Sequence, residues 1–172
     1  LNGEEEYDDF HEYNCRETNL VYYHGHEYYC DVENLDEFVW MEKLEEYHHE
    51  SDVAECPECS GYFLEGDKYY SEITEGDYCC EECRKKAEQA YKKENWHYSD
   101  YDEEYYEHAE DITIYQVWNH ILCEYERKAI SVESAQRLLE AGGLHKLNGK
   151  LYDGIDEETG LPYAYEMNEI NV

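Results

Sequence analysis

Basic residues and proline are scarce in this sequence. Only 13 Lys and Arg residues stand against 45 Asp and Glu residues, which gives a formal net charge of −32 over 172 residues. The one basic island lies on an expected helix, at Arg84, Lys85, Lys86, Lys92 and Lys93. Five bases amid such an acidic excess bind phosphates poorly, so we expect no direct contact with nucleic acid. The two prolines and the absence of a serine-rich stretch leave no recognisable linker.

Long apolar runs and familiar catalytic motifs are also missing. No run of 18 apolar residues occurs, and the acidic start lacks the basic and apolar regions of a signal peptide. The P-loop, GxSxG, HExxH and GxGxxG patterns are absent. The segment 153–160 faintly resembles a calcium loop, but Gly154 and the ligand spacing do not fit an EF-hand. We therefore expect a soluble cytoplasmic protein that is not an enzyme and has no membrane partner.

Aromatic residues are abundant, which is unusual for so acidic a chain. Tyr accounts for 21 residues and aromatics for 16% of the sequence. Acidic disordered chains are poor in aromatics, so this composition favours a folded protein. Local patterns predict an α+β fold of small hairpin and helix units, with no internal repeat. Hairpins are expected at 19–30, 61–73 and 144–153, and helices at 34–47, 81–96, 112–128 and 131–141.

The eight cysteines include two CxxC pairs. Cys56 and Cys59 form the first pair, and Cys80 and Cys83 form the second after twenty intervening residues. Four thiolates satisfy tetrahedral Zn²⁺ and leave no open position, so this spacing predicts a structural zinc site. The second pair opens the expected helix 81–96, whose dipole lowers thiol pKa. Cys79 is an alternative to Cys80, and two disulfides or free thiols are the alternative to zinc.

The order of knuckle, hairpin and helix resembles a treble-clef zinc finger of the LIM-like kind. Cys56-Pro-Glu-Cys59 and Tyr78-Cys79-Cys80-Glu-Glu-Cys83 carry the resemblance, which covers residues 55–95. It implies a metal-bearing module without indicating a function. We accordingly divide the chain into an acidic hairpin–helix unit (1–55), the treble-clef finger (56–97), and an acidic segment with a C-terminal helical unit (98–172).

The remaining cysteines and several histidines have no regular ligand spacing. Cys15 and Cys30, with nearby histidines at 24, 26, 48 and 49, are conceivable ligands of a second metal. We favour the simpler interpretation, in which the hairpin cysteines belong to a core and the histidines lie on a surface. Cys123 lies on the apolar side of the expected helix 112–128 and is therefore predicted to be buried.

The acidic residues are densest in two short segments. Because duplex DNA carries about one charge per ~1.7 Å of axis, −32 matches roughly 16 base pairs. Carboxylates fixed on a folded scaffold at that density would be attracted to a basic nucleic-acid channel, with Tyr as an interface anchor. A solvated face is the plain alternative for any acidic run. The two segments consist of Glu4, Glu5, Glu6, Asp8 and Asp9, and of Asp100, Asp102, Glu103, Glu104, Glu107, Glu110 and Asp111.

In size, acidity and Tyr content the chain resembles the DNA-mimic inhibitors of phages and mobile elements, which block restriction enzymes or CRISPR nucleases. The resemblance is one of composition and includes no diagnostic motif. It implies a bacterial host cell, and a basic nucleic-acid-binding partner such as a Cas nuclease or restriction enzyme. A homodimer is left open. The competing hypothesis is a zinc-finger adaptor that contacts a protein partner through its basic helix or its Tyr surface.

Overall fold

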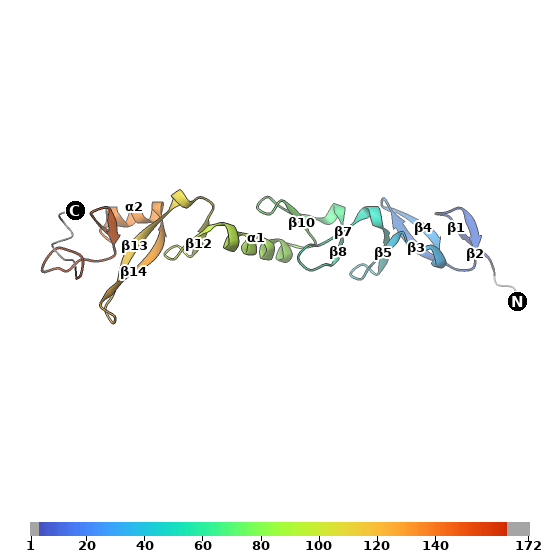
Figure 1. Cartoon of the computed structure of the whole chain (residues 1–172). Coiled ribbons are helices and arrows are strands. Elements are labelled where there is room, and N and C mark those ends of the chain that lie inside the picture. Colours follow the sequence, from blue (N-terminus) through green and yellow to red (C-terminus); the bar gives the residue numbers. More distant parts are fainter. Residues whose placement is uncertain (1–3, 165–172) are drawn as a thin grey trace. The chain divides into compact units, whose positions relative to one another are not determined.

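A computed structural model of the chain describes residues 4–164. The fold is α+β, with mostly two-stranded sheets and two α-helices in the described part. The chain divides into two compact units, Leu1–Glu88 and Gln89–Val172, and each is described by itself. Figure 1 shows the elements of each unit in chain order. The three-part division made from the sequence stays a prediction.

The first unit opens with a short hairpin and a four-stranded sheet. β1 (Glu6–Asp8) pairs with β2 (Tyr13–Cys15). The sheet has the order β4-β3-β6-β5, in which β6 runs parallel to β3 and the other pairs are antiparallel. Val21, Cys30 and Phe38 form its buried core. Its strands are β3 (Thr18–Tyr23), β4 (His26–Asp31), β5 (Phe38–Met41) and β6 (Glu46–His49), with 3₁₀ turns at Val32–Asn34 and Glu50–Asp52.

Two further hairpins and a helix follow in the chain. β7 (Val53–Glu55) pairs with β8 (Tyr62–Leu64), and β9 (Tyr69–Ser71) pairs with β10 (Gly76–Tyr78) after a 3₁₀ turn at Glu65–Asp67. α1 spans Glu81–Asn95, with acids in its first turn and lysines in its last, as the helix dipole favours. Phe63 and Tyr78 form a small core with Cys56. This core lies directly beside the clustered cysteines.

The second unit has the larger apolar core. β11 (His97–Ser99) pairs with β12 (Glu104–Tyr106), and a 3₁₀ turn at Ala109–Asp111 leads into the sheet. The sheet order is β14-β13-β16-β15. α2 (Val132–Ala141) is capped by the Ser131 side chain and ends at left-handed Gly142. The strands are β13 (Ile112–Asn119), β14 (Glu124–Ser131), β15 (His145–Leu147) and β16 (Lys150–Tyr152), and the core holds Tyr115, Ile130, Ala135, Leu144 and Leu151.

The two units repeat the same strand topology, although the sequence analysis found no internal repeat. In each, a short hairpin precedes a long antiparallel hairpin and a helical turn or helix. A second hairpin then returns, so that its last strand runs parallel to the first strand of the long hairpin. Val21 on β3 and Tyr115 on β13 occupy the same place in this parallel pairing. The two cores use different side chains at equivalent positions, which hides the repeat from sequence inspection.

Five hairpins in the described residues share one four-residue loop. We call the last paired residue of the first strand i, and its partner on the second strand is then i+5. Residue i+4 adopts a left-handed backbone with φ between 53° and 64°. In four of them the side chain at i accepts backbone N–H groups inside the loop, as Asx and Ser turns do. The pairs i and i+4 are Asp8 and Glu12, Met41 and Glu45, Ser71 and Glu75, Ser99 and Glu103, and Asn119 and Cys123.

Several expected elements are confirmed and three are wrong. The hairpins at 19–30 and 144–153 and the helices at 81–96 and 131–141 are present. The expected helix 112–128 is instead the hairpin of β13 and β14, because its β-branched and aromatic residues favour strands. The expected helix 34–47 is replaced by β5 and part of β6. Segments 62–64 and 69–71 do not pair with each other but with 53–55 and 76–78.

Candidate metal centre and acidic surfaces

The first cysteine pair lies in a tight knuckle between β7 and β8. The Cys56 N–H donates to Gly61 O at 2.9 Å, and the Ser60 N–H donates to Cys56 O at 2.8 Å, with Ser60 in a left-handed conformation. A Cβ at Gly61 would lie 3.3 Å from Cys59 Sγ, so glycine leaves room for this sulfur. Local hydrogen bonding therefore fixes both thiols of the first pair on one short loop.

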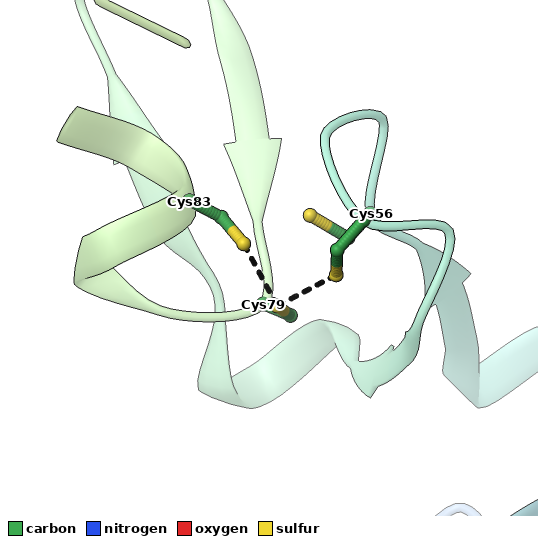
Figure 2. Close-up of side chains that lie close together, drawn as sticks. Cys56, Cys79 and Cys83 are labelled. Atoms are coloured by element: carbon green, nitrogen blue, oxygen red, sulfur yellow. Dashed lines mark hydrogen bonds between the residues drawn. The ribbon is translucent and has the colours of Figure 1, made fainter. Parts of the chain in front are cut away.

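Cysteines 79, 80 and 83 come from the end of β10 and the start of α1. Cys79 follows the last strand residue, Cys80 precedes the helix, and Cys83 lies in its first turn. Figure 2 shows Cys56, Cys79 and Cys83 with their sulfur atoms directed toward one another. The hairpin and the helix therefore deliver thiols to the knuckle from the other side.

Four sulfur atoms lie within 4.8 Å of one another, those of Cys56, Cys59, Cys79 and Cys83. Cys79 Sγ is 3.6 Å from Cys59 Sγ and 3.7 Å from Cys83 Sγ. Tetrahedral zinc with Zn–S bonds of about 2.3 Å holds its sulfur ligands about 3.8 Å apart. No disulfide forms among the cysteines, and these two separations match those between the ligands of a zinc ion bound by four thiolates. The group could therefore bind a metal ion such as zinc.

Three of the four predicted ligands belong to this group, and Cys79 takes the place given to Cys80. Cys80 Sγ lies 3.7 Å from Cys79 Sγ and accepts the Cys83 N–H at 3.5 Å. This hydrogen bond, followed by that of the Cys83 thiol, lowers the pKa of Cys80. Cys80 thus caps the helix start within reach of the group, and Cys79 completes the group itself.

The thiols of the group differ in how readily they ionise. Burial alone would raise the pKa of Cys56, but backbone N–H groups of Cys79, Cys59 and Glu58 outweigh it and lower this pKa to about 6. Burial, with the thiols of Cys59 and Cys80, raises the pKa of Cys79 to about 12. Neighbouring thiols that share hydrogen bonds cannot all lose their protons easily. A metal cation that replaces these protons allows all of the thiols to bind as thiolates.

Cys59 is the exposed member of the group. It borders a cavity of about 350 Å³ together with Trp40, Lys43, Tyr62 and Cys79. Cys56, in contrast, is fully buried against Phe63 and Tyr78. The centre is therefore anchored in the core on one side and open to solvent and reagents on the other.

The two acidic segments are mostly exposed, but two of their members face inward. Asp8 is fully buried, and Asp102 is half-buried where it accepts hydrogen bonds from Ser99, Ser131 and Ser134. Burial opposes ionisation of Asp102, yet these bonds outweigh it and lower its pKa to about 2. Asp8 and Asp102 therefore hold the loops in place. The exposed members are Glu4, Glu5, Glu6, Asp9, Asp100, Glu103, Glu104, Glu107, Glu110 and Asp111.

These exposed carboxylates have no basic side chain beside them. Within residues 4–164, every ion pair that involves Lys or Arg joins residues between 58 and 88. In the basic island, Lys85 pairs with Glu81, and Arg84 pairs with both Glu81 and Glu88. The exposed acids of residues 4–9 and 100–111 thus form no ion pair with Lys or Arg in the described part of the chain.

The other cysteines are placed partly as predicted. Cys15 and Cys30 are buried, as expected for core positions, whereas Cys123 is exposed at the tip of the β13–β14 hairpin, so its predicted burial is wrong. Burial, ahead of the charge of Asp8, raises the pKa of Cys30 to about 12. His24 and His26 are exposed, as expected of surface residues, but His48 is buried and contacts Glu46.

Sequence reasoning missed an aromatic residue at position i−1 in all five hairpins, next to the residue i that precedes the shared loop. Four of the five are well exposed: Tyr7 by 53%, Trp40 by 45%, Tyr70 by 54% and Tyr98 by 43%. The signal was present as Tyr followed by Asp or Ser, with Glu four residues after the Asp or Ser, at 7–12, 70–75 and 98–103. It repeats irregularly along the chain and is therefore easily overlooked.

The described chain has no helix that is long and apolar enough to cross a membrane. Comparison with protein-family models, curated proteins and solved structures found no match for this chain.

Proposed function

We propose that the chain is a zinc-tied acidic binding protein that occupies the nucleic-acid cleft of a basic protein. One structural zinc ion, bound by Cys56, Cys59, Cys79 and Cys83, stabilises a treble-clef-like module. Four protein thiolates complete tetrahedral coordination and leave no position for a substrate, which suits a structural role. In support, the sulfur spacing of the group is that of a zinc cage.

The main support for this function is that carboxylates without a Lys or Arg partner lie near exposed aromatic side chains, which recur along the chain. On the β11–β12 hairpin, Tyr98 packs against Tyr105 at a ring distance of 4.9 Å, while Asp100, Glu103 and Glu104 remain exposed beside it. This hairpin therefore presents a flat aromatic face and negative charge on the same small surface.

This combination matches Arg and Lys side chains better than it matches apolar surfaces. A guanidinium group can stack on an aromatic face and pair with an adjacent carboxylate. Clefts that bind nucleic acid are rich in these cations, and an anionic protein gains steered association toward them. A Cas nuclease or a restriction enzyme has such a cleft, and we take this class as the proposed partner.

The direct test is competition with duplex DNA for purified Cas nucleases and restriction enzymes. We expect the full chain to displace labelled DNA, with an affinity that falls steeply as NaCl rises from 50 to about 300 mM. The key variant combines Asp100→Asn with Glu103→Gln, Glu104→Gln and Glu107→Gln, and leaves the structural Asp102 intact. The matched control neutralises four exposed acids elsewhere, Glu65, Asp67, Glu72 and Glu75. Equal displacement by both variants would remove the 100–107 surface from the proposal, and no displacement by the full chain would end it.

A second candidate function, a protein adaptor, is supported by the tip of the β13–β14 hairpin. Ile121 is 92% exposed and Leu122 is 60% exposed there. Exposed aliphatic residues at a protruding tip can enter an apolar pocket of a partner. Binding that persists at high salt and is lost in Ile121→Ser would favour this function over the competition with DNA.

A further inference from the structure

A second group of potential metal ligands lies in the first unit, outside the cysteine cage. It consists of Asp8 at the end of β1, His11 in the following loop, and Cys30 on β4. One donor atom from each residue lies within 4.8 Å of the other two. We propose that Asp8 Oδ2, His11 Nδ1 and Cys30 Sγ form a second site for a divalent transition metal of the zinc class.

The donor atoms already stand close to the separations that tetrahedral zinc requires. His11 Nδ1 is 2.9 Å from Asp8 Oδ2 and 3.7 Å from Cys30 Sγ. Zinc bonds to oxygen, nitrogen and sulfur of about 2.0–2.3 Å place mixed donor pairs roughly 3.3–3.6 Å apart. These two pairs therefore need movements of only a few tenths of an ångström, and the third pair, Asp8 with Cys30, lies within 4.8 Å.

The surroundings of the three residues also suit a metal site. His11 Nε2 faces Glu37 Oε2 at 3.4 Å, the carboxylate contact that commonly orients a ligating imidazole. Asp8 Oδ2 accepts the Asp31 N–H at 2.7 Å and keeps a second lone pair for an ion. The Cys30 thiol points to Asn34 O at 3.4 Å, and metal binding would release the proton of this thiol to solvent.

The arrangement does not suit a catalytic Cys-His-Asp relay. Asp8 and Cys30 both approach Nδ1 of His11, so the ring cannot pass a proton from one to the other through its two nitrogens. Cys30 is also fully buried. A metal ion, in contrast, needs donor atoms that converge on one point, as these three do.

The second unit provides an internal comparison because it contains the same loop without these ligands. The N–H of Asp31 binds Asp8 in the first unit, and the N–H of Ser131 binds Asp102 in the second. The residues before them, Cys30 and Ile130, are both fully buried core residues. Apolar Ile130 fills this core position in the second unit, so the fold does not require a thiol there. Cys30 therefore adds a potential metal ligand to an otherwise equivalent core.

The metal content of the full chain tests this inference independently of its partners. The protein is purified under reducing conditions, exposed to excess Zn²⁺ and desalted, and zinc per chain is measured by native mass spectrometry. We expect two zinc ions in the wild type, and one each in His11→Ala, in Cys30→Val and in Cys59→Ser. The control His24→Ala alters another histidine of the same unit, which pairs with Asp52, and should keep two. Cys30→Val retains apolar volume at the core position, so far-ultraviolet circular dichroism should be unchanged.

A wild-type chain that holds fewer than two zinc ions would overturn this inference. So would retention of both ions in His11→Ala and Cys30→Val. If Cys59→Ser still holds one ion that is lost only on further substitution of His11, the second site stands regardless of the outcome for the partner proposal.

Discussion

At the scale of single residues, the sharpest question is which of two adjacent cysteines completes the cage. The geometry places Cys79 among the four clustered sulfur atoms, whereas Cys80 accepts a helical N–H. We expect Cys79→Ser to weaken zinc binding at the cage by at least about tenfold, since loss of a ligand costs no less than loss of an outer hydrogen-bond partner. Cys80→Ser should retain the metal. A competition titration with a chromogenic chelator measures both, and a larger loss in Cys80→Ser would assign the ligand to Cys80.

Asp102 makes the stability of the second unit depend on pH. Its pKa falls from the ordinary 3.8 to about 2 because Ser99, Ser131 and Ser134 donate to the carboxylate. A depressed folded-state pKa gives stability that is present above the ordinary pKa and is lost as pH falls from about 4 to 2. The contribution is about 2 kcal/mol.

We therefore expect Asp102→Ala to lower the free energy of unfolding by about 2 kcal/mol at pH 7 and to flatten its fall below pH 4. Urea unfolding at several pH values measures this change. The control Asp100→Ala removes a carboxylate that accepts only the Ala129 N–H, at an exposed position, and should cost less. Equal effects of the two substitutions would contradict the structural role of Asp102.

The CxxC spacing predicted the cysteine group that could bind zinc, but it did not predict the fourth member of this group. The CxxC spacing identified Cys56, Cys59 and Cys83, because knuckle and helix-start geometry is local. Choosing between Cys79 and Cys80 depends on how β10 ends and α1 begins, which is a matter of tertiary placement. Likewise, Asp8 and Asp102 looked like surface acids in the sequence, and only the folded loops show that their carboxylates accept backbone hydrogen bonds.

At the scale of elements, the shared hairpin loop stores strain that can be relieved. Residue i+4 of the loop is Glu in four of the five hairpins and has φ between +53° and +64°. A non-glycine residue pays roughly 1 kcal/mol in this region. We expect Glu103→Gly, at φ 56°, to raise the free energy of unfolding by up to about 1 kcal/mol, less the entropy that Gly adds to the unfolded chain.

The control for this prediction is Glu104→Gly, one residue later in β12. Gly is disfavoured in strands, and Glu104 is the first residue of β12, so this change should destabilise the protein. Chemical denaturation of both variants gives the comparison. Destabilisation by Glu103→Gly as large as that by Glu104→Gly would show that the loop does not carry this strain.

The elements that sequence reasoning predicted correctly have strong local signals. Asn148-Gly149 marks its hairpin, and Ser131 with Gly142-Gly143 marks both ends of α2. The failures at 34–47 and 112–128 share one cause. Their apolar residues happen to recur with helical spacing, while the β-branched and aromatic residues around Val39 and Ile114 pair across strands. The loops at Met41–Glu46 and Asn119–Glu124 lack the glycine that would have signalled a turn.

At the scale of the whole molecule, net charge opposes folding. A formal charge of −32 with few basic partners leaves the two acidic segments self-repelling. Because added salt screens exposed charges, we expect the melting temperature to rise as NaCl increases from about 20 to 300 mM. Differential scanning calorimetry with metal saturated throughout measures it. A melting temperature that stays constant or falls over this range would show that repulsion among the carboxylates is not a main cost of folding.

The central requirement of the proposed function is a metal ion that links the central hairpins to α1, and Co²⁺ substitution tests for it directly. One equivalent of Co²⁺ is added to the reduced apo-protein of the Cys30→Val variant, so that only the cage can provide several thiolates. We predict intense sulfur-to-cobalt charge transfer and the visible bands of tetrahedral tetrathiolate Co²⁺, both abolished by Zn²⁺. Weak octahedral bands, or a spectrum unchanged by Cys56→Ser and Cys83→Ser, would contradict the account.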